Sequence, residues 1–428
     1  MKRYIYTIFV VAAVLPINAQ TRTWSLRDCL DYAVENNIQL KQSRNSILSG
    51  LEDTEQSRKA LFPTLSASTS QGISVMPVAG SDMTYNGSYG LNADMTVYNG
   101  GRLRRSIRQQ EVQNRRDSLS LAQNTMDIEI SIIQAYIQCL YAAESVNMNM
   151  STVEAAQQQR DRAEEMWRTG TVSKVDFSQI ESQLFSDMYQ LTTARNTLES
   201  YRLQLKQLLE LGIDDEIELS GIEATEDDVL RLLPDKAEVY ERALRNMPEV
   251  ESGKLNITAS ELSLKQARSG YIPTVGLSAG IGTSNRNGTG NAFINQIQDN
   301  LNANAGVTVS IPILSGRKNK TAVNKARLSL DNSRLDALST EKSVLKEIEN
   351  TYIEAVNAQS QYVSAKQKEE YARESFSLTT EQFNLGMKNT VELINAKNEY
   401  LSAKQSLLQA KYMTLLNLAI LDVYQGLN

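Results

Sequence analysis

The sequence contains no histidine among its 428 residues. This absence excludes imidazole bases, Ser–His triads and most zinc or iron sites. No glycine-rich phosphate loop follows a predicted strand, which removes the usual means of holding a nucleotide. The sequence therefore predicts no enzyme activity and no cofactor. It offers no catalytic, cofactor-binding or metal-ligating residue.

Long hydrophobic runs are absent beyond the N-terminus. The chain begins with Lys2 and Arg3, continues as an 11-residue apolar run that starts at Ile5, and reaches Ala19. This pattern predicts a signal peptide over residues 1–19, cleaved after the alanine, and therefore export. An anchoring helix is the alternative, but the run is too short to cross a bilayer. No later stretch stays apolar for about 18 residues, so the exported chain is either soluble in the periplasm or a β-barrel.

Cysteine residues are also few, and the sequence has no excess of positive charge. Cys29 and Cys139 enter an oxidising compartment after export. On the helices expected below, Cys29 lies ~46 Å and Cys139 ~57 Å from the strands. This difference in height is larger than a disulfide tolerates, so we expect two free, buried thiols. Loss of Lys2 and Arg3 leaves 42 basic and 50 acidic residues, a net charge of −8. This acidic balance argues against nucleic acid as a partner.

What the sequence does contain is two copies of one unit. Three short segments recur in the same order, at offsets of 210, 215 and 216 residues. We therefore expect the two halves of the chain to fold alike. The matched segments are Ala60-Leu-Phe-Pro-Thr-Leu-Ser with Gly270-Tyr-Ile-Pro-Thr-Val-Gly, Val97-Tyr-Asn-Gly-Gly-Arg102 with Pro312-Ile-Leu-Ser-Gly-Arg317, and Trp167-Arg-Thr-Gly-Thr-Val-Ser-Lys-Val-Asp176 with Phe383-Asn-Leu-Gly-Met-Lys-Asn-Thr-Val-Glu392.

Apolar and polar residues alternate with a period of two between the first two segments of each copy. Leu65 and Ile73, for example, share one face of the chain, and Ser66 lies on the other. The alternation predicts β-hairpins at residues 61–98 and 271–314. A strand of about 13 residues, once tilted by 45°, spans ~30 Å, the thickness of the hydrocarbon core. The hairpins alone do not distinguish strands in a membrane from a soluble sheet packed on a core.

Four strands cannot close a barrel by themselves. In a membrane they would expose unpaired sheet edges to lipid, which hydrocarbon does not tolerate. Membrane strands would therefore require several copies of the chain. Eight, twelve and sixteen strands, from two, three or four copies, all satisfy this requirement, and the pattern does not choose among them.

Two tracts that lack proline and glycine, residues 102–169 and 317–385, predict helices ~100 Å long. Their apolar residues recur at spacings of three and four, as in coiled coils. Together with shorter helices they predict a hollow cylinder of antiparallel helices. A solid bundle is the alternative, but it demands more Leu and Ile than these seams contain. The shorter helices are expected at residues 26–60, 173–209, 236–269 and 390–425.

The expected organisation follows from these elements. Each repeat contains a helix, a β-hairpin, a long helix, a tip turn and a return helix. The expected divisions are a signal peptide at 1–19, a first repeat at 20–211, an equatorial crossover at 212–235 and a second repeat at 236–428. The tip turns are expected at 170–173 and 386–389.

The tip turns are the remaining candidates for a functional site. Gly170 and Gly386 suit the left-handed conformation that ends many helices. Asp176 and Glu392 follow near the start of each return helix, where the simpler interpretation is compensation of the helix dipole. The functional interpretation is an acidic ring around a lumen mouth, with Lys388 as a cation that pairs with it. Further candidates are Ser173 and either Asn389 or Thr390 as helix caps, and Arg168 as a second cation.

The order and spacing of these motifs resemble TolC-like outer membrane efflux proteins over nearly the whole chain. The resemblance rests on the proline-led strands, the strand ends, the tip segments and the opening helix Trp24-Ser-Leu-Arg-Asp-Cys-Leu-Asp-Tyr-Ala-Val-Glu-Asn-Asn37. It implies a mainly α fold with a membrane β-barrel, twelve-stranded as a homotrimer, and a long periplasmic domain of coiled-coil helices. It also implies a passive duct in the outer membrane. A soluble periplasmic coiled-coil adaptor or scaffold is the alternative function.

The resemblance also assigns roles and partners. It places Asp176, Lys388 and Phe383 in a latch that holds the closed state, and Glu392 and Asn395 in two rings that constrict the aperture. Phenylalanine brings no hydroxyl to the latch, and asparagine makes the second ring neutral. The tip turns are implied to dock a periplasmic adaptor, which leads to an inner-membrane pump of the RND, ABC or MFS type, for efflux or type I secretion.

Overall fold

The computed structural model describes residues 23–75, 83–212, 214–222, 224–288 and 290–426. The predicted signal peptide at residues 1–19 lies outside these residues and stays a prediction. The chain forms two compact units, and each unit combines parts of both sequence repeats. Of the described residues, the first unit contains those within 23–34, 131–230 and 361–416, and the second contains those within 35–130, 231–360 and 417–426.

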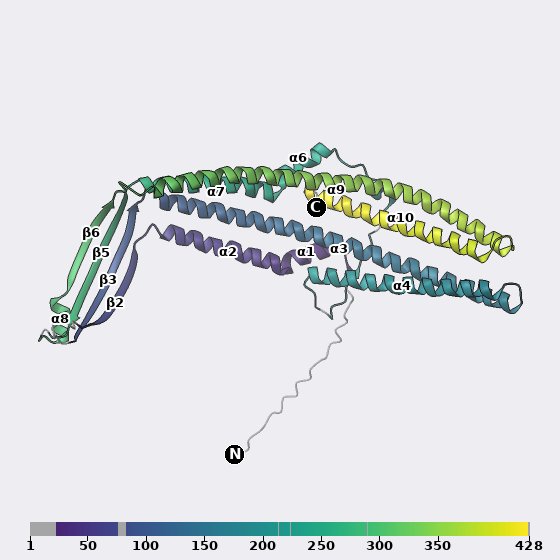
Figure 1. Cartoon of the computed structure of the whole chain (residues 1–428), viewed down its shortest axis with the longest axis horizontal. Coiled ribbons are helices and arrows are strands. Elements are labelled where there is room, and N and C mark those ends of the chain that lie inside the picture. The colour runs from purple at the N-terminus through teal and green to yellow at the C-terminus, as the bar shows by residue number, and fades with distance from the viewer. Residues whose placement is uncertain (1–22, 76–82, 213, 223, 289, 427–428) are drawn as a thin grey trace, which may run out of the picture. The chain divides into compact units, whose positions relative to one another are not determined.

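The second unit contains a single antiparallel sheet of four strands in the order β2-β3-β5-β6 (Figure 1). The two predicted hairpins therefore join through their inner strands, β3 and β5. Within the described part of the chain, β2 and β6 each have one neighbour and leave one edge unpaired. The strands are β2 (Thr64–Ser74), β3 (Thr84–Tyr98), β5 (Thr274–Arg286) and β6 (Asn302–Ser310).

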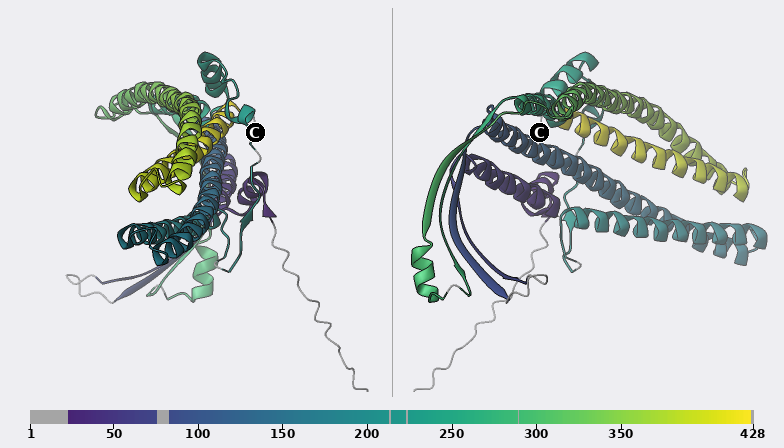
Figure 2. Two further views of the ribbon diagram at one scale, coloured as in Figure 1. Left: turned by 90° about the vertical axis from the view of Figure 1, so that its right-hand side faces the viewer. Right: turned by 60° about the vertical axis from the view of Figure 1, so that its left-hand side comes forward.

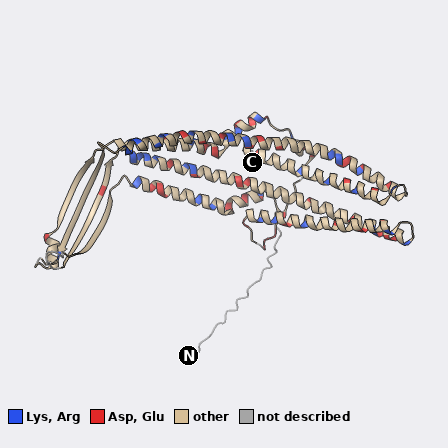
Figure 3. Cartoon of the chain, viewed as in Figure 1, with Lys and Arg blue, Asp and Glu red and all other residues tan. Residues whose placement is uncertain are grey.

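One face of this curved sheet (Figure 2) is apolar and largely exposed. Leu65 is 76% exposed, and Ile73 and Val307 are each 66% exposed. The strands carry two charged residues, Asp94 and Arg286, and are otherwise uncharged in Figure 3. A sheet with an exposed apolar face and two free edges is incomplete as a soluble structure, because it leaves both apolar surface and backbone groups unsatisfied.

A short helix, α8 (Phe293–Asp299), interrupts the second hairpin and was not anticipated from the sequence. The Thr283 hydroxyl donates to the carbonyl of Ile297 at 2.7 Å, and the backbone N–H of Arg286 donates to the side chain of Gln296 at 2.7 Å. These bonds hold α8 against β5. Seven residues are too few for helical periodicity to show in a sequence, which explains why the helix was missed.

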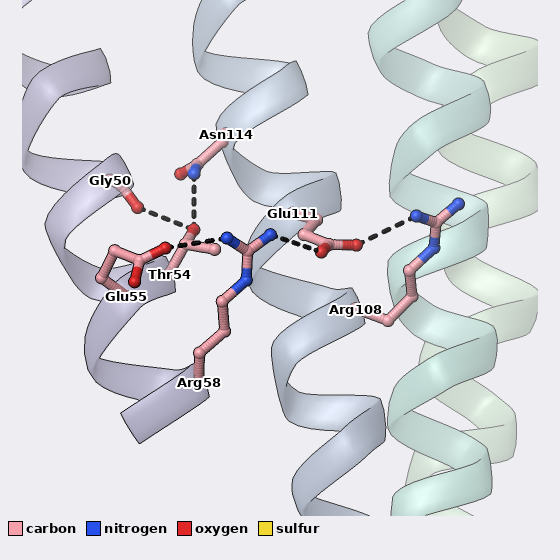
Figure 4. Close-up of polar contacts among 7 residues, drawn as sticks. All are labelled: Gly50, Thr54, Glu55, Arg58, Arg108, Glu111 and Asn114. Atoms are coloured by element: carbon pink, nitrogen blue, oxygen red, sulfur yellow. Dashed lines mark hydrogen bonds and ion pairs between the residues drawn. The ribbon is translucent and has the colours of Figure 1, made fainter. Parts of the chain in front are cut away.

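Helices continue from the strands of the second unit. They are α2 (Ile38–Lys59), residues 102–130 of α3 (Arg102–Arg168), α7 (Pro248–Arg268) and residues 318–360 of α9 (Lys318–Asn384). Several contacts between these helices are made by small or polar side chains. Asn114 of α3 donates to Thr54 of α2 at 2.6 Å (Figure 4), and a β-carbon placed on Gly50 would lie only 2.3 Å from the Asn114 side chain. Such close approach is available only to seams of small side chains.

The same type of contact joins the other helices of this unit. Gln109 of α3 donates to Ser263 of α7 at 3.1 Å, and Ser260 of α7 bonds Ser333 of α9 at 2.7 Å. The helices therefore neighbour one another in the order α2-α3-α7-α9, which is the order of the strands to which they connect. The seam composition accounts for the low aromatic content of the chain.

The two helices expected at residues 26–60 and 236–269 are each broken in two. Asn37 adopts an extended ψ of 130° between α1 (Leu26–Asn36) and α2, and its side chain accepts from the Gln39 amide at 2.9 Å. Met247 has ψ of 119° between α6 (Lys236–Asn246) and α7, because Pro248 restricts the residue before it. An asparagine cap and a proline at the first helical position both start a new helix.

The first unit is built from two helical hairpins. One joins residues 131–168 of α3 to α4 (Lys174–Leu208), and the other joins residues 361–384 of α9 to the start of α10 (Thr390–Gln425). Ala142, Val146 and Leu198 form a buried cluster between α3 and α4. Across the described residues, no helix combines the length and apolar character that a membrane span requires.

The crossover between the repeats is tied to these helices. Strand β1 (Thr23–Trp24) pairs in parallel with β4 (Glu218–Leu219). The Tyr136 hydroxyl of α3, buried at 1% exposure, donates to the Ser220 carbonyl at 2.6 Å. Cys29 and Cys139 are both free and buried, which confirms that expectation, and burial raises the pKa of the Cys139 thiol to about 12. A thiol with so high a pKa is protonated and unreactive.

Candidate functional site

The two tip turns of the first unit are copies of each other. Gly170 follows α3 with φ of +76°, and Gly386 follows α9 with φ of +73°. In each turn the amide after the glycine donates to the carbonyl five residues earlier, at 2.8 Å in the first turn and 2.9 Å in the second. This is the Schellman arrangement, in which the left-handed residue is glycine because a side chain there is strained.

The helix that follows each turn is capped by a polar side chain. Ser173 accepts from the Asp176 amide at 3.1 Å and donates its hydroxyl to the Asp176 carboxylate at 2.6 Å. Asn389 accepts from the Glu392 amide at 2.9 Å, and the Glu392 carboxylate accepts from the Asn389 amide at 3.1 Å. The cap of α10 is therefore Asn389 rather than Thr390. Both acidic residues stabilise helix starts, as the simpler interpretation expects.

The two tip turns of one chain approach each other at Asp176 and Thr390. The side chain of Thr390, which is only 2% exposed, lies close enough to the Asp176 carboxylate to influence its pKa. The hydroxyl of Ser173 and then that of Thr390 hold the pKa of this carboxyl below its usual range. Asp176 therefore stays ionised at any physiological pH.

Of the two cations predicted to pair with the acidic ring, one contacts a ring member, Glu392, and the other pairs outside the ring. Lys388 forms an ion pair with Glu392 one helical turn away, and Arg168 pairs with Glu164 at 2.6 Å. The Lys388 ammonium, and then the Asn389 amide, lower the pKa of the Glu392 carboxyl. Among the described residues, Asp176 has no cationic partner. Asp176 and Lys388, both placed in the latch by the resemblance, thus do not form an ion pair within one chain.

Of the remaining candidates, Glu392 and Asn395 lie three residues apart on α10, which places them on the same helix face. Asn395 is exposed and Glu392 is partly exposed. Phe383 is partly exposed and accepts the Gly386 amide through its carbonyl at 3.0 Å. The structure therefore gathers the predicted residues at one end of the first unit, and their functional roles stay predictions.

Sequence reasoning missed a buried ion pair between the return helices. Lys397 of α10 lies 2.6 Å from Asp187 of α4, and the two side chains are 7% and 6% exposed. Gln183 donates to Asp187 at 2.9 Å and to Asn398 at 3.2 Å. The one available signal was that Lys397 follows buried Leu393 by four residues and so falls on the buried face. Its partner is 210 residues away, and no local pattern identifies it.

Beside this pair lies a groove of about 540 Å³ between α3, α4 and α10. Its lining includes Ser145, Asn149, Gln190 and Ser402. The Tyr412 hydroxyl donates to Glu144 at 2.7 Å nearby and joins α10 to α3. The described residues contain no cluster of three or more Cys, Asp or Glu side chains arranged to hold a metal ion. The residues around this groove join the helices of the first unit through polar contacts.

Comparison with known proteins decides the family. The family model described as outer membrane efflux protein matches residues 29–210 and 239–426. The chain belongs to this outer membrane efflux protein family. The efflux protein is 23% identical to the outer membrane protein TolC of Escherichia coli over 402 residues, which cover 89% of the chain and 78% of TolC.

Two further comparisons agree. The alkaline protease secretion protein AprF of Pseudomonas aeruginosa is 20% identical over 439 residues, covering 99% of the efflux protein and 89% of AprF. The CmeC outer membrane channel of Campylobacter jejuni superposes with a TM-score of 0.80 at 18% identity, covering 100% of the efflux protein and 93% of CmeC. The predicted family, the mainly helical TolC-type fold, the outer-membrane location and the efflux or secretion function are confirmed.

The buried ion pair leads to a stability prediction. Lys397→Met leaves the Asp187 carboxylate buried without its cation, so we expect a loss of about 3–5 kcal/mol in unfolding free energy. The double variant Asp187→Leu, Lys397→Met should recover most of this loss. Arg202→Gln, which breaks the exposed pair with Glu199, is the control and should cost about 1 kcal/mol or less. Guanidinium unfolding followed by circular dichroism measures all three, and equal effects of Lys397→Met and Arg202→Gln would contradict the prediction.

Proposed function

We propose that three copies of this efflux protein close their sheets into one twelve-stranded barrel and form a passive duct through the outer membrane. The open sheet of the second unit carries this proposal. Its edges β2 and β6 are unpaired among the described residues, and its apolar face is exposed. Lipid supplies no hydrogen bonds to such edges, so each edge strand must pair with a neighbouring copy. The number three comes from the resemblance to TolC-like proteins, because closure alone also permits two or four copies.

We propose that the tip turns dock a periplasmic adaptor that leads to an inner-membrane pump of the RND, ABC or MFS type. The turns formed around Gly170, Ser173, Gly386, Asn389 and Thr390 carry exposed apolar side chains, which are typical of docking surfaces. Leu385 is 75% exposed, Met387 is 70% exposed and Val175 is 67% exposed. The similarity to AprF, an alkaline protease secretion protein, supports type I secretion as one use of such a duct.

The same tips form the proposed gate. Asp176, Lys388 and Phe383 act in the latch of the closed state, and Glu392 and Asn395 line the aperture. Three observations support this assignment: Asp176 lies close to Thr390 of the second turn, Lys388 pairs with Glu392, and the two aperture residues share a helix face. Because Lys388 does not reach Asp176 within one chain, a contact between them would join neighbouring copies.

The assembly is tested by its mass. We expect the detergent-extracted protein, recovered from the outer-membrane fraction, to have three times the mass of the mature chain and a mostly helical circular dichroism spectrum. Light scattering with a correction for bound detergent measures the mass. A stable monomer would overturn the proposal, since four strands cannot close a barrel.

The latch is tested by single-channel conductance in planar bilayers. Asp176→Ala and Lys388→Ala each remove a contact that favours the closed state. We expect roughly a two-fold to ten-fold rise in time-averaged conductance, because the equilibrium shifts toward the open state. Arg162→Ala removes an exposed cation from the same end of α3 and is the matched control. If neither tip variant differs from this control, the latch lies elsewhere.

The aperture assignment predicts a pH-dependent block by multivalent cations. Glu392→Gln should weaken the block, because it removes the carboxylate that attracts the cation. In the parent channel the block should persist as the pH falls through the ordinary glutamate pKa and disappear only below it, since Lys388 lowers the pKa of Glu392. Conductance recorded against pH with and without the blocking cation measures this effect. An equal block in parent and variant would remove Glu392 from the pore.

A further inference from the structure

A belt of positive charge surrounds the junction between the strands and the helices of the second unit (Figure 3). Four stretches flank the sheet at this junction, residues 56–63, 99–110, 262–273 and 311–330, and none contains Asp or Glu. Both sequence repeats contribute to the belt. Its thirteen members are Arg58, Lys59, Arg102, Arg104, Arg105, Arg108, Lys265, Arg268, Arg317, Lys318, Lys320, Lys325 and Arg327.

Five of these cations stand where the helix itself disfavours them. Arg102, Arg104 and Arg105 occupy the first turn of α3, and Lys318 and Lys320 occupy that of α9. Neither helix has an acidic residue in its first turn, and nor do α2 and α8, whereas the other six α-helices all do. The positive end of the helix dipole repels a cation. Helix stability therefore does not explain these side chains, and an external anion would.

Few of the belt cations are neutralised inside the unit. The Glu111 carboxylate of α3 forms ion pairs with Arg58, at 3.2 Å, and with Arg108, at 3.0 Å (Figure 4). Arg105, the one belt member that is not exposed, donates to the Ser269 hydroxyl at 2.6 Å. The eleven belt residues other than Arg58 and Arg108 form no ion pair with a described Asp or Glu. The belt thus ends at Glu111 on α3, and beyond it acidic and basic residues are mixed.

The belt adjoins the apolar surface of the sheet and a set of aromatic side chains. Phe62 is 61% exposed, Tyr98 is 50% exposed and Tyr271 is 53% exposed, and all three lie at strand ends beside the belt. Exposed aromatic residues at the border of an apolar surface are typical of the membrane interface. Arg and Lys side chains are long enough to reach from the first helical turns to the same level.

We propose that this belt binds the anionic phospholipid headgroups of the periplasmic leaflet, and so fixes the height of the duct in the outer membrane. This inference rests on the proposed function, because it requires the sheet to lie in the membrane. Guanidinium and ammonium groups recognise phosphate by charge-assisted hydrogen bonds. Clusters of four to eight cations beside a membrane segment attract anionic lipid, and each chain presents more than that.

Native mass spectrometry of the detergent-purified full-length assembly tests the proposal. The probes are phosphatidylglycerol and phosphatidylcholine, titrated separately at equal concentration. We expect phosphatidylglycerol to bind at least about five-fold more tightly. The variant Arg104→Gln, Lys318→Gln, Lys320→Gln should reduce this preference to about two-fold or less. Raising the salt from low to about 0.5 M should reduce it in the parent protein as well.

A matched control removes the same charge elsewhere in the unit. Lys254→Gln, Lys342→Gln, Lys346→Gln changes three exposed cations outside the belt and should retain the parent preference. Equal binding of both lipids to the parent assembly, or equal losses in the two triple variants, would overturn the proposal. If the belt variant does not assemble, the comparison of the two lipids on the parent protein still tests the proposal. A parent assembly of trimeric mass without lipid preference would overturn the proposed lipid binding alone. A monomeric parent protein would overturn the proposed function.

Discussion

The backbone groups at the edges of β2 and β6 impose the strongest constraint on this protein. An unpaired N–H or carbonyl in hydrocarbon costs several kcal/mol, and an edge strand presents a row of them. The chain cannot cover these edges with its own strands, so other copies must supply the missing partners. The exposed apolar face has the same consequence, because it needs lipid as its neighbour. Both features of the sheet are intelligible once the chain is part of a closed barrel.

The closed barrel in turn dictates the arrangement of the helices in the second unit. Each strand continues into a helix, so the helices must follow one another in the order of the strands. Strands lie about 4.8 Å apart and packed helices about 8–10 Å apart, so helices that continue a barrel need close seams. The approach of Gly50 to Asn114 and the bond between Ser260 and Ser333 provide them. Small polar side chains at these seams are therefore a geometric requirement of the barrel.

The sequence predicted the parts of the fold that rest on local signals. Period-two alternation located the strands, uninterrupted tracts located α3 and α9, and lone glycines located the tip turns at Gly170 and Gly386. Features that depend on one residue or on distant partners were missed. Asn37 and Pro248 break helices that periodicity alone extends across them, and α8 is shorter than the window that periodicity needs. The pairing of Asp187 with Lys397 depends on tertiary structure, which no local pattern encodes.

The first unit contains one buried ion pair and several exposed, weaker contacts. Their positions along the helices determine which segments can move at a low cost in free energy. The pair of Asp187 and Lys397 is buried, so separating its charges exposes each to an unfavourable environment and costs several kcal/mol. The contacts closer to the turns, such as that of Lys388 with Glu392, are partly exposed and compete with water. If a partner docks at the tips as proposed, it therefore needs little energy to displace the turns. Separation of α4 from α10 at the buried pair needs far more, so the proposed gate is expected to open only in the segments between that pair and the glycines.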